Sequence, residues 1–317
     1  MTTQPASRFQ IYMSFALVYV FWGSTYLAIA IAVKNIPAAL MTGVRFSIAG
    51  ALMLLFCWWK KKKIRLTRYD VLRLFAIGLL LLSCGNTLLV WTEGFIPSGL
   101  ASLFVAVVPI YIAVIEGLIL RGDRVTGRGW IGILLGTLGL FLLLWSQLDS
   151  PSALKREQLF ACGGVMLGAL AWACGSILSR RSKLSIDPFT ATGWEMVMAG
   201  GTNMLLAIIV GDFHHVVWAR SGLLAIGYLI IFGSWVGFTA FIWLLEHVPT
   251  PKVATYAYVN PVVAVFLGFL ILHEHLGRFE IAGMCVIVVA VALVTSSKLK
   301  SGAPAAEQEI EMCEREA

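Results

Sequence analysis

Glu93-Gly94-Phe95-Ile96-Pro97 and Glu246-His247-Val248-Pro249 are two versions of one stretch, 153 positions apart. Each is followed by small residues and then by a proline inside an apolar run, Pro109 in the first copy and Pro261 in the second. A chain built from two copies of a membrane unit is typical of a carrier whose binding site lies between the copies. The match extends in both directions, since Gly23-Ser24 recurs as Gly175-Ser176, Thr42-Gly43 as Thr192-Gly193, and Gly132 as Gly283.

The composition places the chain in a lipid bilayer. Hydrophobic residues make up 59% of the sequence and charged residues 13%, and the mean hydropathy of +0.86 is too high for a soluble domain. Stretches long enough to cross about 30 Å of hydrocarbon recur along the chain. We therefore predict an all-α integral membrane protein with ten transmembrane helices, near residues 11–33, 38–59, 72–92, 98–120, 129–147, 158–179, 187–210, 221–245, 252–272 and 279–297.

Lysine and arginine are concentrated in alternate loops. The loop after the second predicted span holds Lys60 to Lys63, and the loop after the sixth holds Arg180, Arg181 and Lys183. By the positive-inside rule this side faces the cytoplasm, and both termini are expected there. The net charge of +7 is therefore interpreted as an orientation signal, and no nucleic-acid partner is expected.

The number of spans in each copy has a topological consequence. Five spans is an odd number, so the second copy must enter the membrane upside down, and the basic loop does move from after the second span to after the first. Two inverted five-helix repeats can exchange conformations, and each exchange changes which face is open. We expect an N-terminal segment (1–10), a first repeat (11–147), a linker (148–157), a second repeat (158–297) and a disordered acidic tail (298–317).

Four short strings occur in a specific order and spacing: Phe21-Trp22-Gly23-Ser24-Thr25, Gly43-Val44-Arg45-Phe46, Pro97-Ser98-Gly99-Leu100-Ala101-Ser102 with Pro109, and Ala257-Tyr258-Val259-Asn260-Pro261 with Glu274. With them the chain resembles the EamA-type permeases of the drug/metabolite transporter superfamily over residues 11–297. The resemblance implies a basket-shaped, multi-pass carrier of the cell (inner) membrane with both termini cytoplasmic. It also implies a central cavity and, usually, export of amino acids, other metabolites or toxic compounds.

Pro109 and Pro261 are candidate hinges. Each lies near the middle of a predicted span, where proline removes a backbone hydrogen bond and clashes with the carbonyl four residues earlier, on Val105 and Ala257. Freed carbonyls in hydrocarbon are tolerated only against protein or a wet cavity. The kinks are therefore expected to face the site and act as pivots, although membrane helices also use proline for shape alone.

Arg45 and Glu195 are ionisable residues inside predicted spans, at equivalent positions of the two copies. At 1.5 Å per residue, Arg45 lies about 10 Å deep from outside and Glu195 about 12 Å deep from the cytoplasm. In a core of about 30 Å this leaves about 8 Å between the two backbones, which the side chains can span. The two residues could form a gate, a substrate-carboxylate site on Arg45, a proton carrier on Glu195, or a static brace.

Polar and aromatic residues at membrane depth predict an aromatic-walled, hydrogen-bonding pocket for a small amphipathic solute. Such groups must find partners inside the protein or in a cavity, and each alone is more often helix-packing glue. Four glutamates near span ends, Glu93, Glu116, Glu246 and Glu274, are expected to reach water instead. The predicted pocket residues are Ser24, Thr25, Asn86, Trp91, Tyr256, Tyr258 and Asn260.

No cofactor and no metal are expected. The sequence contains no Walker A string and no His-Glu-x-x-His motif, and His273-Glu274-His275 lacks a complete ligand set. The motifs Gly132-xxx-Gly136 and Gly164-xxx-Gly168 permit close helix contact, either inside the subunit or in a homodimer.

The inverted repeat and the paired prolines favour a carrier over an enzyme, because no catalytic pair stands out. We predict a secondary active transporter that moves a small-molecule metabolite, such as an amino acid, a related amphipathic compound or a drug, across the cytoplasmic membrane. The resemblance favours export, with coupling to protons or to solute exchange. The alternative is a membrane channel, facilitator or sensor without coupled transport.

Overall fold

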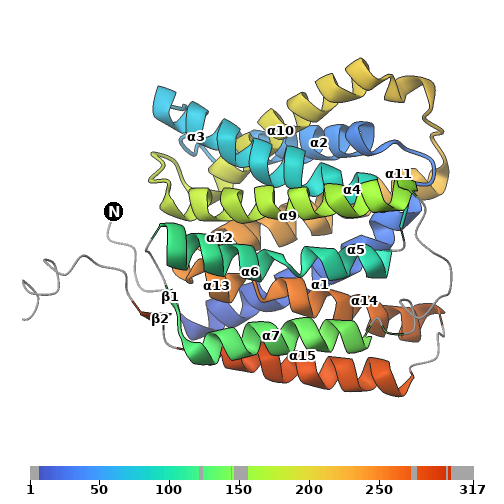
Figure 1. Ribbon diagram of the computed structural model, residues 1–317. Helices are drawn as coiled ribbons and strands as arrows, with labels where there is room; N and C mark the ends of the chain where they lie inside the picture. The colour runs from blue at the N-terminus through green and yellow to red at the C-terminus, as the bar shows by residue number, and fades with distance from the viewer. Residues whose placement is uncertain are drawn as a thin grey trace, which may run out of the picture.

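The computed structural model describes residues 7–96, 98–120, 124–143, 145, 156–272, 277–297 and 299–300. The predicted acidic tail beyond Lys300, the linker up to Lys155 and the segment His273–His275 lie outside the described residues. Nearly all of the described chain is helical (Figure 1). Two short strands, β1 (Arg124–Val125) and β2 (Leu299–Lys300), pair antiparallel at one end of the bundle.

The helices of the first repeat form five apolar segments, and the third and fourth of these are composite. The fourth segment is interrupted at Ala106–Val107, just before Pro109. The segments are α1 (Arg8–Ala32); α2 (Ala38–Trp59); α3 (Arg68–Gly78) with the π-helical η1 (Leu79–Asn86) and α4 (Thr87–Thr92); α5 (Ser98–Val105) with α6 (Val108–Val114) and the π-helical η2 (Ile115–Ile119); and α7 (Gly127–Leu143).

The second repeat has the same order of segments. A short 3₁₀ turn, η3 (Asp212–His214), follows its second helix. The segments are α9 (Arg156–Arg181); α10 (Pro188–Val210); α11 (Arg220–Tyr228) with the π-helical η4 (Leu229–Phe238) and α12 (Thr239–His247); α13 (Thr250–Val253) with α14 (Tyr256–Leu272); and α15 (Arg278–Ser296).

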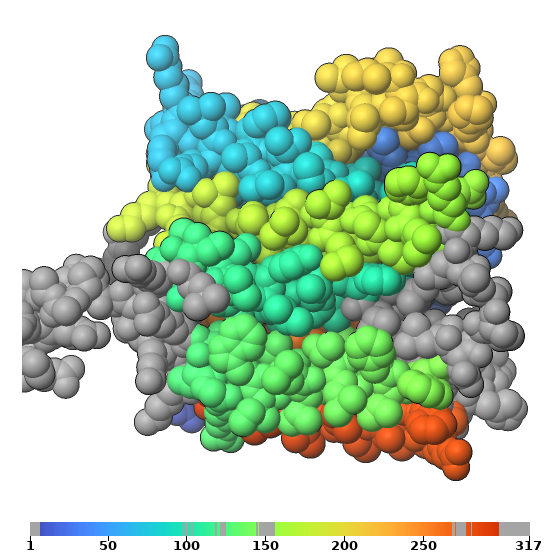
Figure 2. All heavy atoms as spheres, in the orientation of Figure 1, coloured from blue at the N-terminus to red at the C-terminus, as the bar shows by residue number. Residues whose placement is uncertain are grey.

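The length of these segments suits a bilayer. Six of them, at 22 to 28 residues, are long and apolar enough to cross a membrane on their own. Large apolar side chains also cover the outside, among them Leu55 at 57% exposed and Ile209 at 71% exposed. Figure 2 shows one face, on which α3, α9, α6 and α7 follow one another across the view. The all-α membrane architecture predicted from the sequence is confirmed.

Helices of one repeat pack on helices of the other. Helix α2 packs on α10, and α7 packs on α15; the two pairs lie at opposite edges of the bundle in Figure 1. Between them, α1 packs on α11, η4, α12 and α14, whereas α9 packs on η1, α4, α5 and α6. Helices of both repeats therefore pack together throughout one bundle. No boundary in the middle of the sequence separates two independent domains.

Close glycine contacts reveal that this packing is symmetric. A Cβ atom on Gly43 would lie 3.0 Å from Met204 N, and a Cβ atom on the equivalent Gly193 would lie 3.0 Å from Leu54 Cδ2. Exchanging the two repeats turns one contact into the other, because position 43 corresponds to position 193 and position 204 to position 54. Helices α2 and α10 are therefore antiparallel about a pseudo-two-fold axis, which confirms the inverted repeat.

The α7–α15 pair obeys the same symmetry. A Cβ atom on Gly132 would lie 3.0 Å from Ala290 O, and one on the equivalent Gly283 would lie 2.7 Å from Gly139 O. The glycines thus allow the backbones to approach closely, as small residues do in membrane helices.

Both predicted glycine motifs are used inside the chain. Gly132 lies against α15, and a Cβ atom on Gly136 would lie 3.0 Å from the Tyr258 ring. A Cβ atom on Gly164 would lie 2.8 Å from the Trp91 ring, and one on Gly168 would lie 3.1 Å from the carbonyl oxygen of Gly85. These motifs are explained by packing within one subunit, and a homodimer stays a prediction.

Candidate functional site

A narrow cavity lies between the two repeats, and the volume open to the centres of water molecules in it is about 70 Å³. Ten of its first-repeat residues lie in the second half of α1, the first half of α2 and the second half of the third segment, on the side of the bundle away from the basic loop 60–67, whereas Val105 and Val108 lie near the middle of the fourth segment. Both repeats line it: Trp22, Thr25, Tyr26, Ile29, Arg45, Phe46, Leu82, Gly85, Asn86, Leu89, Val105 and Val108 from the first, and Val165, Gly168, Ala169, Trp172, Gly233, Phe238, Tyr256 and Asn260 from the second.

An aromatic cluster forms much of the wall. The Trp22 ring lies 5.4 Å from Trp172 and 5.1 Å from Tyr256, both edge-on, and 4.9 Å from Phe241. The Trp22 indole Nε1 donates a hydrogen bond to the carbonyl oxygen of Gly233, at 3.1 Å. Because edge-to-face ring pairs at these separations are stabilising, the wall is rigid and apolar.

Arg45 supplies the positively charged group in the cavity lining. Its side chain is 4% exposed, its Nε donates to Ser234 Oγ at 3.0 Å, and its guanidinium lies 4.9 Å from the centre of the Phe46 ring. Gly233 makes room for it, because a Cβ atom there would lie 2.7 Å from Arg45 Nη2. Arg45 Nη1 is buried and has no hydrogen-bond partner in the described part of the chain.

Two amide oxygens complete the polar lining. Asn86 Oδ1 and Asn260 Oδ1 are buried, and neither has a hydrogen-bond partner among the described residues. Asn86 ends η1 on the first repeat, and Asn260 precedes Pro261 on α14 of the second. Buried polar groups are normally hydrogen-bonded. Together with Arg45 Nη1, these two oxygens beside one cavity are therefore available to a ligand or to water.

The π-helical segments η1 and η4 shape the cavity. They occupy matching positions in the two repeats, and η1 contributes Leu82, Gly85 and Asn86 to the lining, whereas η4 contributes Gly233 and Phe238. A π-helix shifts the backbone hydrogen bonds, and such segments are frequent at functional sites. Thr87 Oγ1 donates to the carbonyl oxygen of Leu82 at 3.1 Å, which satisfies one displaced carbonyl.

Arg45, Glu195 and the seven predicted pocket residues make nine predicted site residues. The structure brings five of them to the cavity, Thr25, Arg45, Asn86, Tyr256 and Asn260, and places the other four elsewhere. Ser24 contacts Tyr228 on α11, Oγ to Oη at 2.6 Å. Trp91 is 38% exposed and packs on Phe95. Tyr258 is fully buried and donates to the Ile133 carbonyl oxygen at 3.2 Å. Glu195 is buried outside the lining.

Arg45 and Glu195 do not pair in the described part of the chain. Gly50 lies against Val197 and Gly43 against Met204, so in this antiparallel register Arg45 faces position 202 and Glu195 faces position 52. The two residues are thus seven positions apart along the pair, about 10 Å at 1.5 Å per residue. Arg45 turns to Ser234 instead. The predicted gate or brace is therefore not formed in this conformation.

The two prolines lie in different surroundings. Pro109 stands at the start of α6, directly after the interruption at Ala106–Val107, whereas Pro261 lies inside the continuous helix α14. In the second repeat the interruption comes earlier, at Ala254–Thr255. The fourth segment is therefore broken just before Pro109, whereas α14 continues through Pro261. The hinge role stays a prediction.

Two of the four glutamates expected to reach water are buried. Glu116 is 2% exposed and forms an ion pair with Arg181, Oε2 to Nη2 at 2.8 Å. Glu93 is 9% exposed, and Glu246 is exposed as predicted. Position near a span end does not reveal which way a side chain faces, and both buried groups face the neighbouring repeat or the bundle interior. Glu274 lies outside the described residues.

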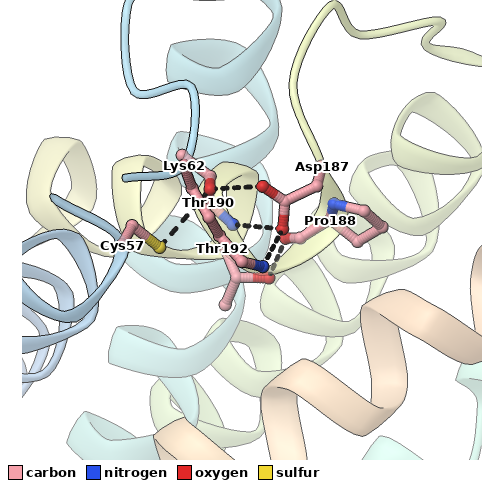
Figure 3. Close-up of polar contacts among 6 residues, drawn as sticks. All are labelled: Cys57, Lys62, Asp187, Pro188, Thr190 and Thr192. Carbon is pink, nitrogen blue, oxygen red and sulfur yellow. Dashed lines mark hydrogen bonds and ion pairs between the residues drawn. The ribbon is translucent and has the colours of Figure 1, made fainter. Parts of the chain in front are cut away.

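Polar contacts join loops 60–67 and 182–187 at the basic end of the bundle. Lys62 Nζ lies 2.9 Å from Asp187 Oδ1, and Thr190 Oγ1 donates to Asp187 Oδ2 at 2.6 Å (Figure 3). Partial burial acts to raise the pKa of Asp187, but hydrogen bonds from Thr190 and Lys62 outweigh it and hold that pKa below its usual range. Nearby, Asp70 accepts hydrogen bonds from Ser185 and Thr67.

The basic half is also closed nearer the cavity. Arg180 Nη1 donates to the carbonyl oxygens of Leu245 and Val248 at 2.9 and 2.6 Å, and the Arg181–Glu116 ion pair lies beside it. These contacts tie α9 to segments of both repeats. These contacts therefore hold helices together at the basic end, on the opposite side from most of the first-repeat lining of the cavity.

Sequence reasoning predicted an aromatic-walled pocket and assigned Tyr256 to it, but it did not assign Trp22 or Trp172. The rings of Trp22, Trp172 and Tyr26 do not recur in the other copy, since Cys174 is equivalent to Trp22, Val20 to Trp172 and Leu178 to Tyr26. The available signal was a tryptophan inside an apolar span, because its indole N–H must find a hydrogen-bond partner there.

The described residues hold no group of three or more His, Cys, Asp or Glu side chains that could bind a metal.

Comparison with known proteins agrees with this architecture. The model of the EamA-like transporter family matches residues 10–145 and again residues 159–296. The chain is 37% identical to the uncharacterized inner membrane transporter YedA of Escherichia coli K12, with 90% of each chain covered. It is 23% identical to the uncharacterized transporter YoaV of Bacillus subtilis, over 88% of this chain and 94% of that one.

A solved crystal structure has the same fold. Its TM-score is 0.76 at 19% sequence identity, and the match covers 91% of this chain and 97% of that chain. At this identity the likeness shows the fold alone. Two family matches that together span nearly the whole sequence, and a relative above 30% identity over 90% of it, establish that the chain belongs to the EamA-like transporter family.

Proposed function

We propose that this protein is a secondary active transporter that exports a small amphipathic metabolite by alternating access between its two inverted repeats. The observation that carries the proposal is the cavity at the repeat interface. It contains three buried polar groups, Arg45 Nη1, Asn86 Oδ1 and Asn260 Oδ1, that have no partner among the described residues. Inverted-repeat transporters bind their substrate at such an interface.

The lining defines the chemistry of the solute. The guanidinium of Arg45 suits a carboxylate or another anionic group, since charge-assisted bonds from arginine are short and strong. The oxygens of Asn86 and Asn260 accept hydrogen bonds and so suit a donor such as an ammonium group. The rings of Trp22, Trp172 and Tyr256 suit an apolar body. An amino acid or a related metabolite carries all three features.

The asymmetry of the two halves supports alternating access. The cavity lies away from the basic loops, and the basic half is closed by Lys62–Asp187 and Arg181–Glu116. In the exchanged conformation these ion pairs break and the other half closes. Lys62 and Asp187 are 39% and 36% exposed, so breaking their pair costs at most about 1 kcal/mol.

The orientation and the coupling are part of the proposal. By the positive-inside rule the basic end faces the cytoplasm, so the cavity of this conformation lies towards the outside. Export then requires the basic end to open, so that the solute enters the cavity from the cytoplasm. A proton gradient or exchange for another solute drives the cycle, and no resident cofactor takes part.

The test begins with a metabolite comparison of media from cells with and without the protein. The compound enriched in the medium is then loaded into proteoliposomes with and without a pH gradient. Coupled transport predicts accumulation against the solute gradient, and Arg45→Ala should remove it. A channel or facilitator would equilibrate the solute without concentrating it. No difference between the media and no flux of any enriched compound would overturn the proposal.

A further inference from the structure

Glu93 lies one helical turn beyond the part of the third segment that lines the cavity. Leu82, Asn86 and Leu89 of the third segment line the cavity, and Glu93 follows Leu89 by four residues, one helical turn further out on the same face. It is the C-cap residue of α4, and its backbone N–H donates to the Leu89 carbonyl oxygen at 3.0 Å. Glu93 therefore continues the face of this segment that lines the cavity, just beyond the end of the membrane-spanning helix.

The carboxyl group is buried without a hydrogen-bond partner. Glu93 is 9% exposed, and neither Oε1 nor Oε2 has a partner in the described parts of the chain. A buried carboxylate that lacks both a counter-charge and hydrogen bonds is strongly disfavoured, whereas the protonated form is not. Burial accordingly raises the pKa of Glu93 well above its usual range.

Neighbouring elements offer no compensating charge among the described residues. Tyr26 of α1, which lines the cavity, offers a neutral phenol and no positive charge. Arg45 of α2 turns to Ser234. The other charged groups on adjoining elements are exposed, namely Lys34 in the turn after α1 and Arg156 and Glu157 at the start of α9. Glu93 forms no ion pair with any of these described groups.

The second repeat supplies an internal comparison. Glu246 is equivalent to Glu93, yet it is exposed at the opposite end of the bundle. Leu178 stands where the first repeat has Tyr26, so the pair of carboxyl and phenol belongs to one repeat alone. In an inverted repeat the two copies exchange conformations, and the exchange predicted for this pair would expose Glu93 and bury Glu246.

We propose that Glu93 is a proton-binding site at the end of the third segment, which holds its proton while that end is packed as here and exchanges it with the adjoining solution when that end opens. The proton moves between water and one carboxyl oxygen, with no other bond made or broken. Leu89, one helical turn before Glu93, lines the solute cavity. This inference deepens the proposed transport function, and its test below does not require transport.

A carbodiimide reagent tests the charge state directly. Dicyclohexylcarbodiimide, an apolar reagent, modifies protonated carboxyl groups in apolar surroundings. In membranes near pH 7, mass spectrometry should find the adduct on Glu93 of the wild-type chain and of Glu246→Gln, the matched control. A water-soluble carbodiimide should prefer Glu246. An adduct on Glu246 with none on Glu93 would overturn the proposal, whether or not the protein transports any solute.

The pH dependence of stability gives a second readout. A free glutamate has a pKa of about 4.3, and the folded Glu93 holds its proton to higher pH. The stability that this group contributes is complete below the unfolded pKa and is lost as pH rises to the folded pKa. Over that window, the folding equilibrium of the wild-type protein should fall by up to about tenfold per pH unit relative to Glu93→Gln.

Thermal unfolding of the detergent-purified proteins at a series of pH values measures this difference. Glu93→Gln keeps the shape of the side chain and removes its titration, so it should fold and show the flatter profile. Identical profiles for Glu93→Gln and the wild type would contradict the proposal. If Glu93 is labelled but a pH gradient fails to drive transport, the proton site stands and the proposed coupling fails.

Discussion

Replacing Gly200 with alanine tests the antiparallel contact between α2 and α10, on which the inverted architecture rests. The new Cβ atom would lie 2.5 Å from Ser47 Oγ and 2.9 Å from Ser47 Cα, whereas non-bonded carbon atoms prefer about 3.5 to 4.0 Å. Because one of the contacting atoms belongs to the backbone, the helices must separate. Overpacking of this kind costs about 1 to 3 kcal/mol.

The adjacent residue provides the control. A Cβ atom on Gly201 would meet nothing within 4 Å among the described residues, so Gly201→Ala should gain up to about 1 kcal/mol from helix propensity. The two variants should therefore differ by about 2 to 4 kcal/mol in thermal unfolding of the detergent-purified protein. Gly50→Ala, the repeat equivalent of Gly200→Ala, should also destabilise. Equal stability of the Gly200 and Gly201 variants would refute the assigned contact.

Three further predictions concern charges and hinges. Asp70→Ala removes the acceptor of hydrogen bonds that join two loops, and thermal unfolding should show a loss of about 2 to 4 kcal/mol; a loss under about 0.5 kcal/mol would contradict those bonds. Arg45→Ala and Glu195→Ala should add within about 0.5 kcal/mol in a double-mutant cycle of stability, and a larger coupling would reveal a contact that this conformation lacks. Pro109→Ala and Pro261→Ala each restore a backbone donor and should bias the transporter towards opposite facings; unchanged side-specific labelling of a cavity cysteine in both would limit the prolines to shape.

The sequence predicted the membrane fold because its signals are local or repeated. Hydrophobic length marks the spans, and the recurrence of Thr42-Gly43 as Thr192-Gly193 marks the symmetry that the structure shows between α2 and α10. The interruption at Ala106–Val107 and the π-helical segments could not be predicted in the same way. They depend on which neighbouring helix satisfies each displaced backbone group, and that is set by tertiary packing.

The candidate site was predicted in part. Polarity at membrane depth identified Asn86 and Asn260, but the same criterion selected Tyr258, whose hydroxyl is satisfied by a backbone carbonyl outside the cavity. Depth alone also suggested a pair between Arg45 and Glu195. The register of α2 against α10, which hydropathy does not encode, separates them. Glu93 was misplaced because the direction of a side chain at a helix end depends on its neighbours.

The central claim is that the cavity opens to one side at a time. An impermeant thiol reagent, applied from each side of oriented vesicles to Thr25→Cys in a background without native cysteines, measures this directly. Labelling should be faster from the side away from the basic loops. Adding Arg181→Ala, which removes the ion pair with Glu116, should raise labelling from the basic side and lower it from the other side. A rise from the basic side with no fall from the other would indicate a channel open at both ends and would contradict alternating access.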